Sequence, residues 1–198
     1  QRAAAVQLAR AGRYDEAMDY MERVRQRQGN THFDFLALAA AETDPDTRAG
    51  LLQSFDRLLK KYPNDGQLLF GKALLLQQDG RAEEALKLLE TSEAKQDQSA
   101  PLLLRARLLQ SLGRGEEALP LLKKGMERNP SDKRLRLTYA RQLVELGRMD
   151  EARGEFSSLL QQFPEDDDLR FSLALVCMEA EAWREAIVYL EELIQRDA

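Results

Sequence analysis

Six alanines recur along this chain of 198 residues at intervals of 33 or 34 residues. They are Ala5, Ala39, Ala73, Ala106, Ala140 and Ala174. A second column follows twelve residues later and consists of Ala17, Leu51, Ala85, Ala118, Ala152 and Ala186. A period near 34 residues with two small-residue columns predicts stacked helical hairpins. One such unit is too small to bury an adequate core, so we expect neighbouring units to share one.

Each unit carries its own turn signals. Five residues before the second column stand the glycines Gly12, Gly80, Gly113 and Gly147, with Asp46 and Glu181 in the other two units. Glycine tolerates the positive φ that ends a helix and admits a tight turn. A glutamate directly precedes the second column in every unit except the second, which has Gly50. Twelve residues after that column, the prolines Pro63, Pro130 and Pro164 predict helix ends.

These columns predict six repeats, at residues 1–31, 32–65, 66–98, 99–132, 133–166 and 167–198. Each repeat is expected to contain a helix, a glycine turn, a second helix and a proline turn. One helical turn after the second column, Met21, Phe55, Leu89, Leu122, Phe156 and Leu190 are expected to face the same core. Because the chain begins inside a helical unit, we expect it to be a fragment of a longer protein.

The turn motifs carry a family resemblance. GRYDEA at Gly12–Ala17, GRAEEA at Gly80–Ala85, GRGEEA at Gly113–Ala118 and GRMDEA at Gly147–Ala152 resemble tetratricopeptide repeats. The resemblance covers the whole chain and implies an all-α, right-handed superhelical solenoid of about six hairpins. It also implies a concave groove, lined mainly by the first helix of each repeat, that holds a peptide, a helix or a partner protein.

Three features depart from the family pattern. Repeat 2 has Asp44–Pro45–Asp46 at its turn, and repeat 3 is one residue short, with no proline between Thr91 and Ser99. We therefore expect a local change of superhelical twist between repeats 3 and 4. Arg136 and Arg170 stand where the family often has a large apolar residue, so we expect the packing faces of their helices to be rotated.

The resemblance places a partner-binding groove on the first helices. Its predicted residues are Phe33, Leu36, Phe70, Leu74, Gln77, Leu103, Arg107, Gln110, Leu137, Arg141, Phe171, Leu175 and Met178. Exposed together, the apolar members would form a patch larger than a monomer usually leaves in water. Arginine and aromatic residues also anchor many interfaces. Two alternatives remain: the leucines pack between hairpins, and Arg107 and Arg141 form solvated ion pairs with neighbouring carboxylates.

Other function classes find little support in the composition. A net charge of −5 argues against nucleic acid, which requires a cationic face. The single cysteine, Cys177, excludes an intrachain disulfide and a thiolate metal cage, and it is expected to pack as a small apolar side chain. No apolar stretch approaches the roughly 18 residues of a membrane span.

We expect no enzymatic activity, no cofactor and no metal site. His32 is the only histidine, and no set of nucleophile, base and oxyanion donors can be assembled around it. The acidic run Glu165–Asp168 lacks the alternating ligands and central glycine of a calcium loop. We expect this run to cap the helix that follows it.

The leading hypothesis is a non-catalytic scaffold or adaptor that binds an extended or helical protein segment in its concave groove. The alternative is a structural module that self-assembles into oligomers through its ends or another face. The residue usage, with many arginines, glutamines and leucines and few lysines, resembles bacterial members of the family. Several of those are periplasmic or outer-membrane lipoproteins, so a cytoplasmic or periplasmic location, with a lipid tether in the full-length protein, stays open.

Overall fold

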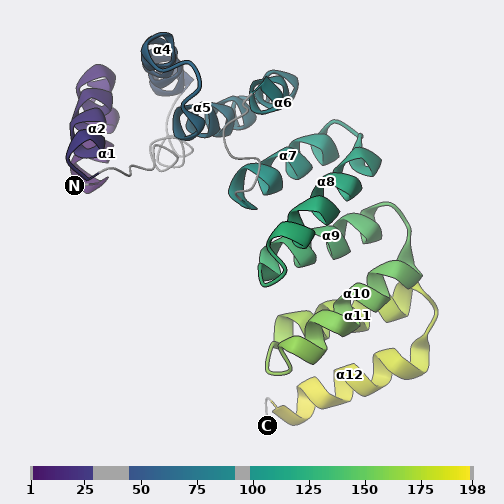
Figure 1. The fold of residues 1–198 in the computed structure, drawn as a ribbon. Helices are drawn as coiled ribbons and strands as arrows, with labels where there is room; N and C mark the ends of the chain where they lie inside the picture. Colours follow the sequence, from purple (N-terminus) through teal and green to yellow (C-terminus); the bar gives the residue numbers. More distant parts are fainter. Residues whose placement is uncertain (1, 29–44, 92–98, 197–198) are drawn as a thin grey trace. The chain divides into compact units, whose positions relative to one another are not determined.

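The computed structural model describes residues 2–28, 45–91 and 99–196, and these residues form helices joined by short turns, with no strand. The all-α prediction is therefore confirmed (Figure 1). The helices are α1 (Arg2–Arg10), α2 (Tyr14–Gln28), α4 (Pro45–Lys61), α5 (Gly66–Gln78), α6 (Ala82–Thr91), α7 (Ser99–Ser111), α8 (Gly115–Arg128), α9 (Lys133–Glu145), α10 (Met149–Gln162), α11 (Asp167–Glu179) and α12 (Trp183–Arg196).

The chain divides into two compact units, Gln1–Leu108 and Leu109–Ala198, and the division falls within α7. In the N-terminal unit α1 packs on α2, α2 on α4, α4 on α5 and α5 on α6. In the C-terminal unit α8 packs on α9, α9 on α10, α10 on α11 and α11 on α12. In these two runs, α1 to α6 and α8 to α12, each described helix therefore packs on the next described helix along the chain.

Both small-residue columns lie in the interior. All described members of the first column, from Ala5 to Ala174, are at most 1% exposed, and members of the second column are at most 2% exposed. The column one turn later is also buried from Met21 to Phe156. Its last member, Leu190, is only half-buried. The predicted core positions are therefore confirmed, with one exception on α12.

The turns follow the predicted chemistry. Gly12, Gly80, Gly113 and Gly147 all have positive φ values between 71° and 74°. Glu181, which replaces glycine in the last repeat, adopts the same left-handed conformation with φ 58°. In repeat 2, which has no turn glycine, α4 begins at Pro45, where the fixed φ suits a first helical residue and no amide donor is needed.

Aspartates begin three of the first helices. Asp65, Asp132 and Asp166 are the N-cap residues of α5, α9 and α11, and each side chain accepts a hydrogen bond from a backbone amide of the first turn. Such caps satisfy amides that have no partner inside the helix. Asp166 lies in the acidic run Glu165–Asp168, so the prediction that this run caps a helix is confirmed.

The second helices begin with a different device. In four repeats an arginine just before the helix, or at its N-cap, forms two hydrogen bonds to a glutamate three residues later. The pairs are Arg13–Glu16, Arg81–Glu84, Arg114–Glu117 and Arg148–Glu151. The motif GRxxEA therefore encodes a left-handed glycine and an ion pair that holds the glutamate at the positive end of the helix.

The C-terminal unit has one core that several hairpins share. Leu119 of α8, Leu143 of α9, Phe156 of α10, Leu173 of α11 and Ala186 of α12 all belong to it. Cys177 also lies in this core and is fully buried, as predicted. Within this unit neighbouring repeats do share a single interior.

Arg136 and Arg170, where we expected rotated packing faces, each link the two helices of one hairpin. Arg136 of α9 donates to Ser158 of α10 at 3.1 Å and lies 3.5 Å from Glu155. Arg170 is only 6% exposed; it contacts Glu192 of α12 at 3.0 Å, Asp167 at 2.6 Å and the carbonyl oxygen of Pro164. Each arginine thus reaches from the first helix of its repeat to the second.

Candidate functional site

The predicted groove residues of α11 form an exposed apolar surface. Phe171, Leu175 and Met178 are 50%, 43% and 38% exposed. Their spacing of four and three residues places them on one face of the helix. The opposite face of α11 enters the shared core through Leu169, Leu173 and Val176. The helix is therefore apolar on both sides, although only one side packs within the unit.

On α9 the equivalent positions differ. Leu137 is half-buried and packs against the core of the C-terminal unit, as the first alternative proposed for the leucines. Arg141 is exposed, and no described carboxylate forms an ion pair with its guanidinium. Gln110, near the end of α7, is also exposed. An exposed cation without a partner is free to receive a carboxylate or a carbonyl from another molecule.

The N-terminal unit presents less of the predicted surface. Phe70 and Gln77 on α5 are half-buried, and Leu74 between them is only 8% exposed, so Leu74 belongs to the core. On α7, Leu103 is half-buried and Arg107 is exposed, without an ion pair to any described residue. The remaining predicted positions, Phe33 and Leu36, lie outside the described residues, as does His32.

One apolar surface was missed in the sequence. Trp183, Ile187, Val188 and Ile194 on α12 are 51% to 71% exposed. In the sequence these residues look like ordinary members of an amphipathic second helix. The sequence signal that could have revealed this surface is the number of apolar residues on α12. Trp183, Val188 and Ile194 lie outside the two columns that contain Ala186 and Leu190.

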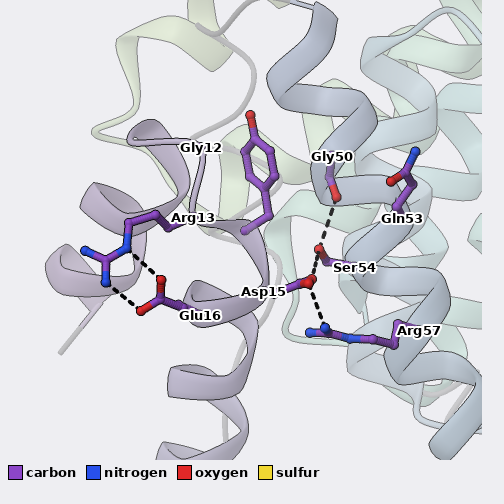
Figure 2. Close-up of a pocket in the computed structure, with 9 residues that line it drawn as sticks. Gly12, Arg13, Asp15, Glu16, Gly50, Gln53, Ser54 and Arg57 are labelled. Atoms are coloured by element: carbon purple, nitrogen blue, oxygen red, sulfur yellow. Dashed lines mark hydrogen bonds and ion pairs between the residues drawn. The ribbon is translucent and has the colours of Figure 1, made fainter.

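A polar pocket of about 470 Å³ lies in the N-terminal unit, where the start of α2 meets α4 (Figure 2). It is lined by Gly12, Arg13, Tyr14, Asp15, Glu16, Gly50, Gln53, Ser54 and Arg57. Sequence reasoning did not single it out, because its two walls come from different repeats.

The charged groups of this pocket are paired with one another. Arg13 holds Glu16 with bonds of 2.7 and 2.6 Å, which raises the pKa of the Arg13 guanidinium and lowers the pKa of Glu16. Asp15 accepts a hydrogen bond from Ser54 at 2.8 Å and lies 2.8 Å from Arg57. Two cations therefore balance two carboxylates, and the pocket has no net charge with which to attract an ion.

Other candidate chemistry is weak in the described ranges. Burial raises the pKa of the Cys177 thiol, and Glu185 raises it further, so this thiol is a poor nucleophile. Residues 2–28, 45–91 and 99–196 contain no group of three or more His, Cys, Asp or Glu side chains arranged to hold a metal ion. Of the described helices, none combines the length and apolar character needed to cross a membrane.

Comparison with protein families gives consistent matches. Two family models, both described as tetratricopeptide repeat, match residues 109–162 in one case and residues 52–101 and 137–198 in the other. A curated relative, TPR repeat-containing protein PA4667 of Pseudomonas aeruginosa, is 72% identical over 140 residues, which are 71% of this chain and 24% of the relative. The chain thus matches about a quarter of that protein's length.

Solved structures share the fold at low sequence identity. A crystal structure of MamA superposes with a TM-score of 0.68 at 14% identity and covers 77% of this chain and 90% of MamA. A tetratricopeptide repeat protein from Parabacteroides merdae gives 0.67 at 18% identity, over 98% of this chain and 77% of its own. YrrB, described as a TPR protein with an unusual peptide-binding site, superposes with a TM-score of 0.65 at 18% identity. The match covers 88% of this chain and 91% of YrrB. The predicted solenoid fold is therefore confirmed.

Proposed function

We propose, on the premise that this chain belongs to the tetratricopeptide repeat family, that it is a non-catalytic adaptor whose first helices bind a segment of a partner protein. Proteins of this family act as interaction scaffolds for protein or peptide partners, and the solved relative YrrB has a peptide-binding site.

The observation that carries the proposal is the combination of exposed apolar residues and an unpaired cation in the C-terminal unit. We call Arg141, Phe171, Leu175 and Met178 the candidate partner surface. The three apolar side chains of α11 are each more than a third exposed, whereas the opposite face of the same helix is buried. Contact between these apolar side chains and water is unfavourable. A partner that covers them would gain binding free energy in proportion to the apolar area buried.

The surface also indicates the chemistry of its partner. Apolar positions spaced one helical turn apart suit the side chains of an extended or helical segment that lies along α11. A carboxylate on the same segment would pair with Arg141 and fix the register, since the guanidinium offers several donors in a planar arrangement. We therefore infer that the partner segment carries apolar residues and at least one acidic residue.

The test uses affinity capture with the full chain from an extract of Pseudomonas aeruginosa, the source of the 72% identical relative. The double variant Phe171→Ser/Leu175→Ser should lose the captured partner while keeping its helix content, because both side chains are already exposed. Arg141→Glu should weaken capture and make the remaining binding less sensitive to salt.

Arg184→Glu is the matched control. Arg184 is also an exposed arginine without an ion pair to any described residue, but it lies on α12, outside the candidate partner surface. It changes the net charge by the same amount. If Arg184→Glu and Arg141→Glu reduce capture equally, the effect is one of total charge and the proposed surface is wrong.

A further inference from the structure

The exposed residues of α12 form a continuous stripe. Trp183, Ile187, Leu190 and Ile194 are spaced by four, three and four residues, so they lie on one face of the helix. Trp183, Ile187 and Ile194 are 56%, 53% and 71% exposed, and Leu190 is half-buried. Ala186, one helical turn before Leu190, borders the stripe and enters the core. We call these four residues the α12 stripe.

Two positions of the stripe, those of Ile187 and Leu190, are buried in most of the earlier repeats. Ile187 corresponds to Met18, Leu52, Leu86 and Leu119, which are at most 7% exposed, and to Arg153 in the preceding repeat, which is half-buried. Leu190 corresponds to a column whose other members are at most 5% exposed. The Leu190 column is therefore core in all five earlier repeats and the Ile187 column in four of them, whereas on α12 Leu190 is half-buried and Ile187 is exposed.

The helix that covers these positions is the first helix of the following repeat. On α8 the stripe corresponds to Gly115, Leu119, Leu122 and Met126, and α9 packs on α8. A β-carbon on Gly115 would meet the side chains of Gln142, which lies on α9, and Leu146, which directly follows α9. On α10 the position equivalent to Leu190 is Phe156, which is 2% exposed and shares a cluster with Leu169 and Leu173 of α11.

We infer that the α12 stripe is the surface on which the first helix of a further repeat packs, and that α12 is an internal helix of a longer repeat array. Terminal repeats of such arrays need a polar outer face to remain soluble, and the outer face of α12 is apolar. The helix that fits this surface carries apolar residues at the positions of Leu169, Leu173 and Val176 in α11, because these residues share a core with Phe156 and Leu159 of α10.

A second copy of this chain offers a poorer fit. The exposed end helix of the N-terminal unit is α1, and its positions equivalent to Leu173 and Val176 are Ala4 and Gln7. Both are exposed, and together they present much less apolar area than a leucine and a valine. Head-to-tail docking of α1 on the α12 stripe would therefore bury a small and a polar side chain against Trp183 and Ile187.

The only tryptophan of the chain, Trp183, lies in the stripe and reports on its coverage. The test appends a copy of residues 165–198 directly after Ala198, which continues the 34-residue register. In the copy, the tryptophan is replaced by phenylalanine, so that Trp183 remains the only fluorophore of its kind. We expect its emission to shift to shorter wavelength and its quenching by acrylamide to fall roughly twofold, as an aromatic ring becomes buried.

Two variants control the experiment. In the first, the copied residues that correspond to Leu169, Leu173 and Val176 are changed to serine, which removes the apolar face of the added helix. In the second, Ile187→Asp places a charge in the stripe of the extended chain. Both should leave Trp183 as accessible as it is in the original chain.

Three outcomes would overturn the inference. Quenching of Trp183 could remain unchanged in the extended chain, whether or not the added residues gain helix by circular dichroism. The serine variant could protect Trp183 as well as the intact copy does. Finally, the original chain could double its mass in sedimentation with Trp183 protected, which would make a second copy the occupant. Because none of these readouts involves Arg141, Phe171 or Leu175, they do not depend on the proposed partner surface.

Discussion

The ring of Tyr14, the first residue of α2, lies directly against the α-carbon of Gly50 in α4. A β-carbon added at Gly50 would overlap the ring at its Cδ2 and Cε2 atoms. Gly50 stands in the column that is glutamate in the other five repeats. The departure of repeat 2 from the repeat pattern is therefore explained by its neighbour, whose aromatic residue occupies the space that a side chain at residue 50 would need.

Gly50→Ala should destabilise the protein by about 1–3 kcal/mol, since the added methyl group forces the Tyr14 ring out of its position. Urea unfolding followed by circular dichroism measures the change. The double variant Tyr14→Ala/Gly50→Ala should be less destabilised than the sum of the two single variants, because the overlap is absent once the ring is removed.

Gly154→Ala is the matched control for this prediction. Gly154 is also inside a second helix, α10, but nothing lies within 4 Å of a β-carbon added there. The substitution should stabilise the protein by about 0.5–1 kcal/mol through helix propensity alone. If both glycine variants changed stability in the same direction, contact with Tyr14 would not be the reason for Gly50.

The sequence predicted those features that each repeat determines for itself. The alanine columns report close helix contacts, the glycines report a positive φ, and Pro63, Pro130 and Pro164 each follow a helix end by two residues. These are local properties of the backbone or of one hairpin. They recur at a fixed period, so six alanines in the first column, four turn glycines and three prolines all support one interpretation.

Features that depend on two repeats were harder to predict. Leu74 and Leu175 occupy equivalent positions, yet Leu74 is 8% exposed and Leu175 is 43% exposed. Their difference comes from what packs beside each helix, which a column of residues does not reveal. Likewise, Arg170 looked like a disturbance of the packing face, because its partner Glu192 lies 22 residues away in the next helix.

Glu181→Gly should stabilise the protein by about 0.5–1 kcal/mol. Glu181 has φ 58° in the turn between α11 and α12, where four other repeats have glycine. A side chain in the left-handed conformation costs about 1–2 kcal/mol, and the greater freedom of glycine in the unfolded chain offsets part of that gain. Thermal or urea unfolding gives the value, and Gly147→Ala, which introduces a side chain at the equivalent turn, should shift stability the opposite way. A loss of stability in Glu181→Gly would contradict the idea that this turn is strained.

Arg170→Ala should cost about 2–3 kcal/mol, because a nearly buried guanidinium links three acceptors in different parts of the last hairpin. Arg136→Ala removes the equivalent residue of the previous repeat. Its side chain is 23% exposed and its ion pair with Glu155 is longer, at 3.5 Å, so the loss should be about 1 kcal/mol or less. Urea unfolding measures the loss of unfolding free energy in each variant. Equal losses would mean that the burial of Arg170 does not strengthen its contribution to stability.

Asp166 should make the stability of α11 depend on pH. Its carboxylate accepts hydrogen bonds from Lys133 and from the amide of Leu169, and the bond from Lys133 is the main reason that the pKa of Asp166 is lowered. Since the folded pKa lies below the unfolded value, this carboxylate stabilises the fold fully above about pH 5, and the contribution is lost as the pH falls through the lowered pKa.

Asp166→Asn keeps an acceptor for the helix cap but removes the charge that faces Lys133. We expect it to unfold at lower urea concentration than the original chain at pH 7, with the gap closing as the pH falls through the lowered pKa of Asp166, whereas Asp168→Asn, at an exposed aspartate without an ion pair to any described residue, should show no gap. A gap for Asp166→Asn that stays constant as the pH is lowered from about 7 until the original chain unfolds would show that the ion pair with Lys133 contributes nothing to stability.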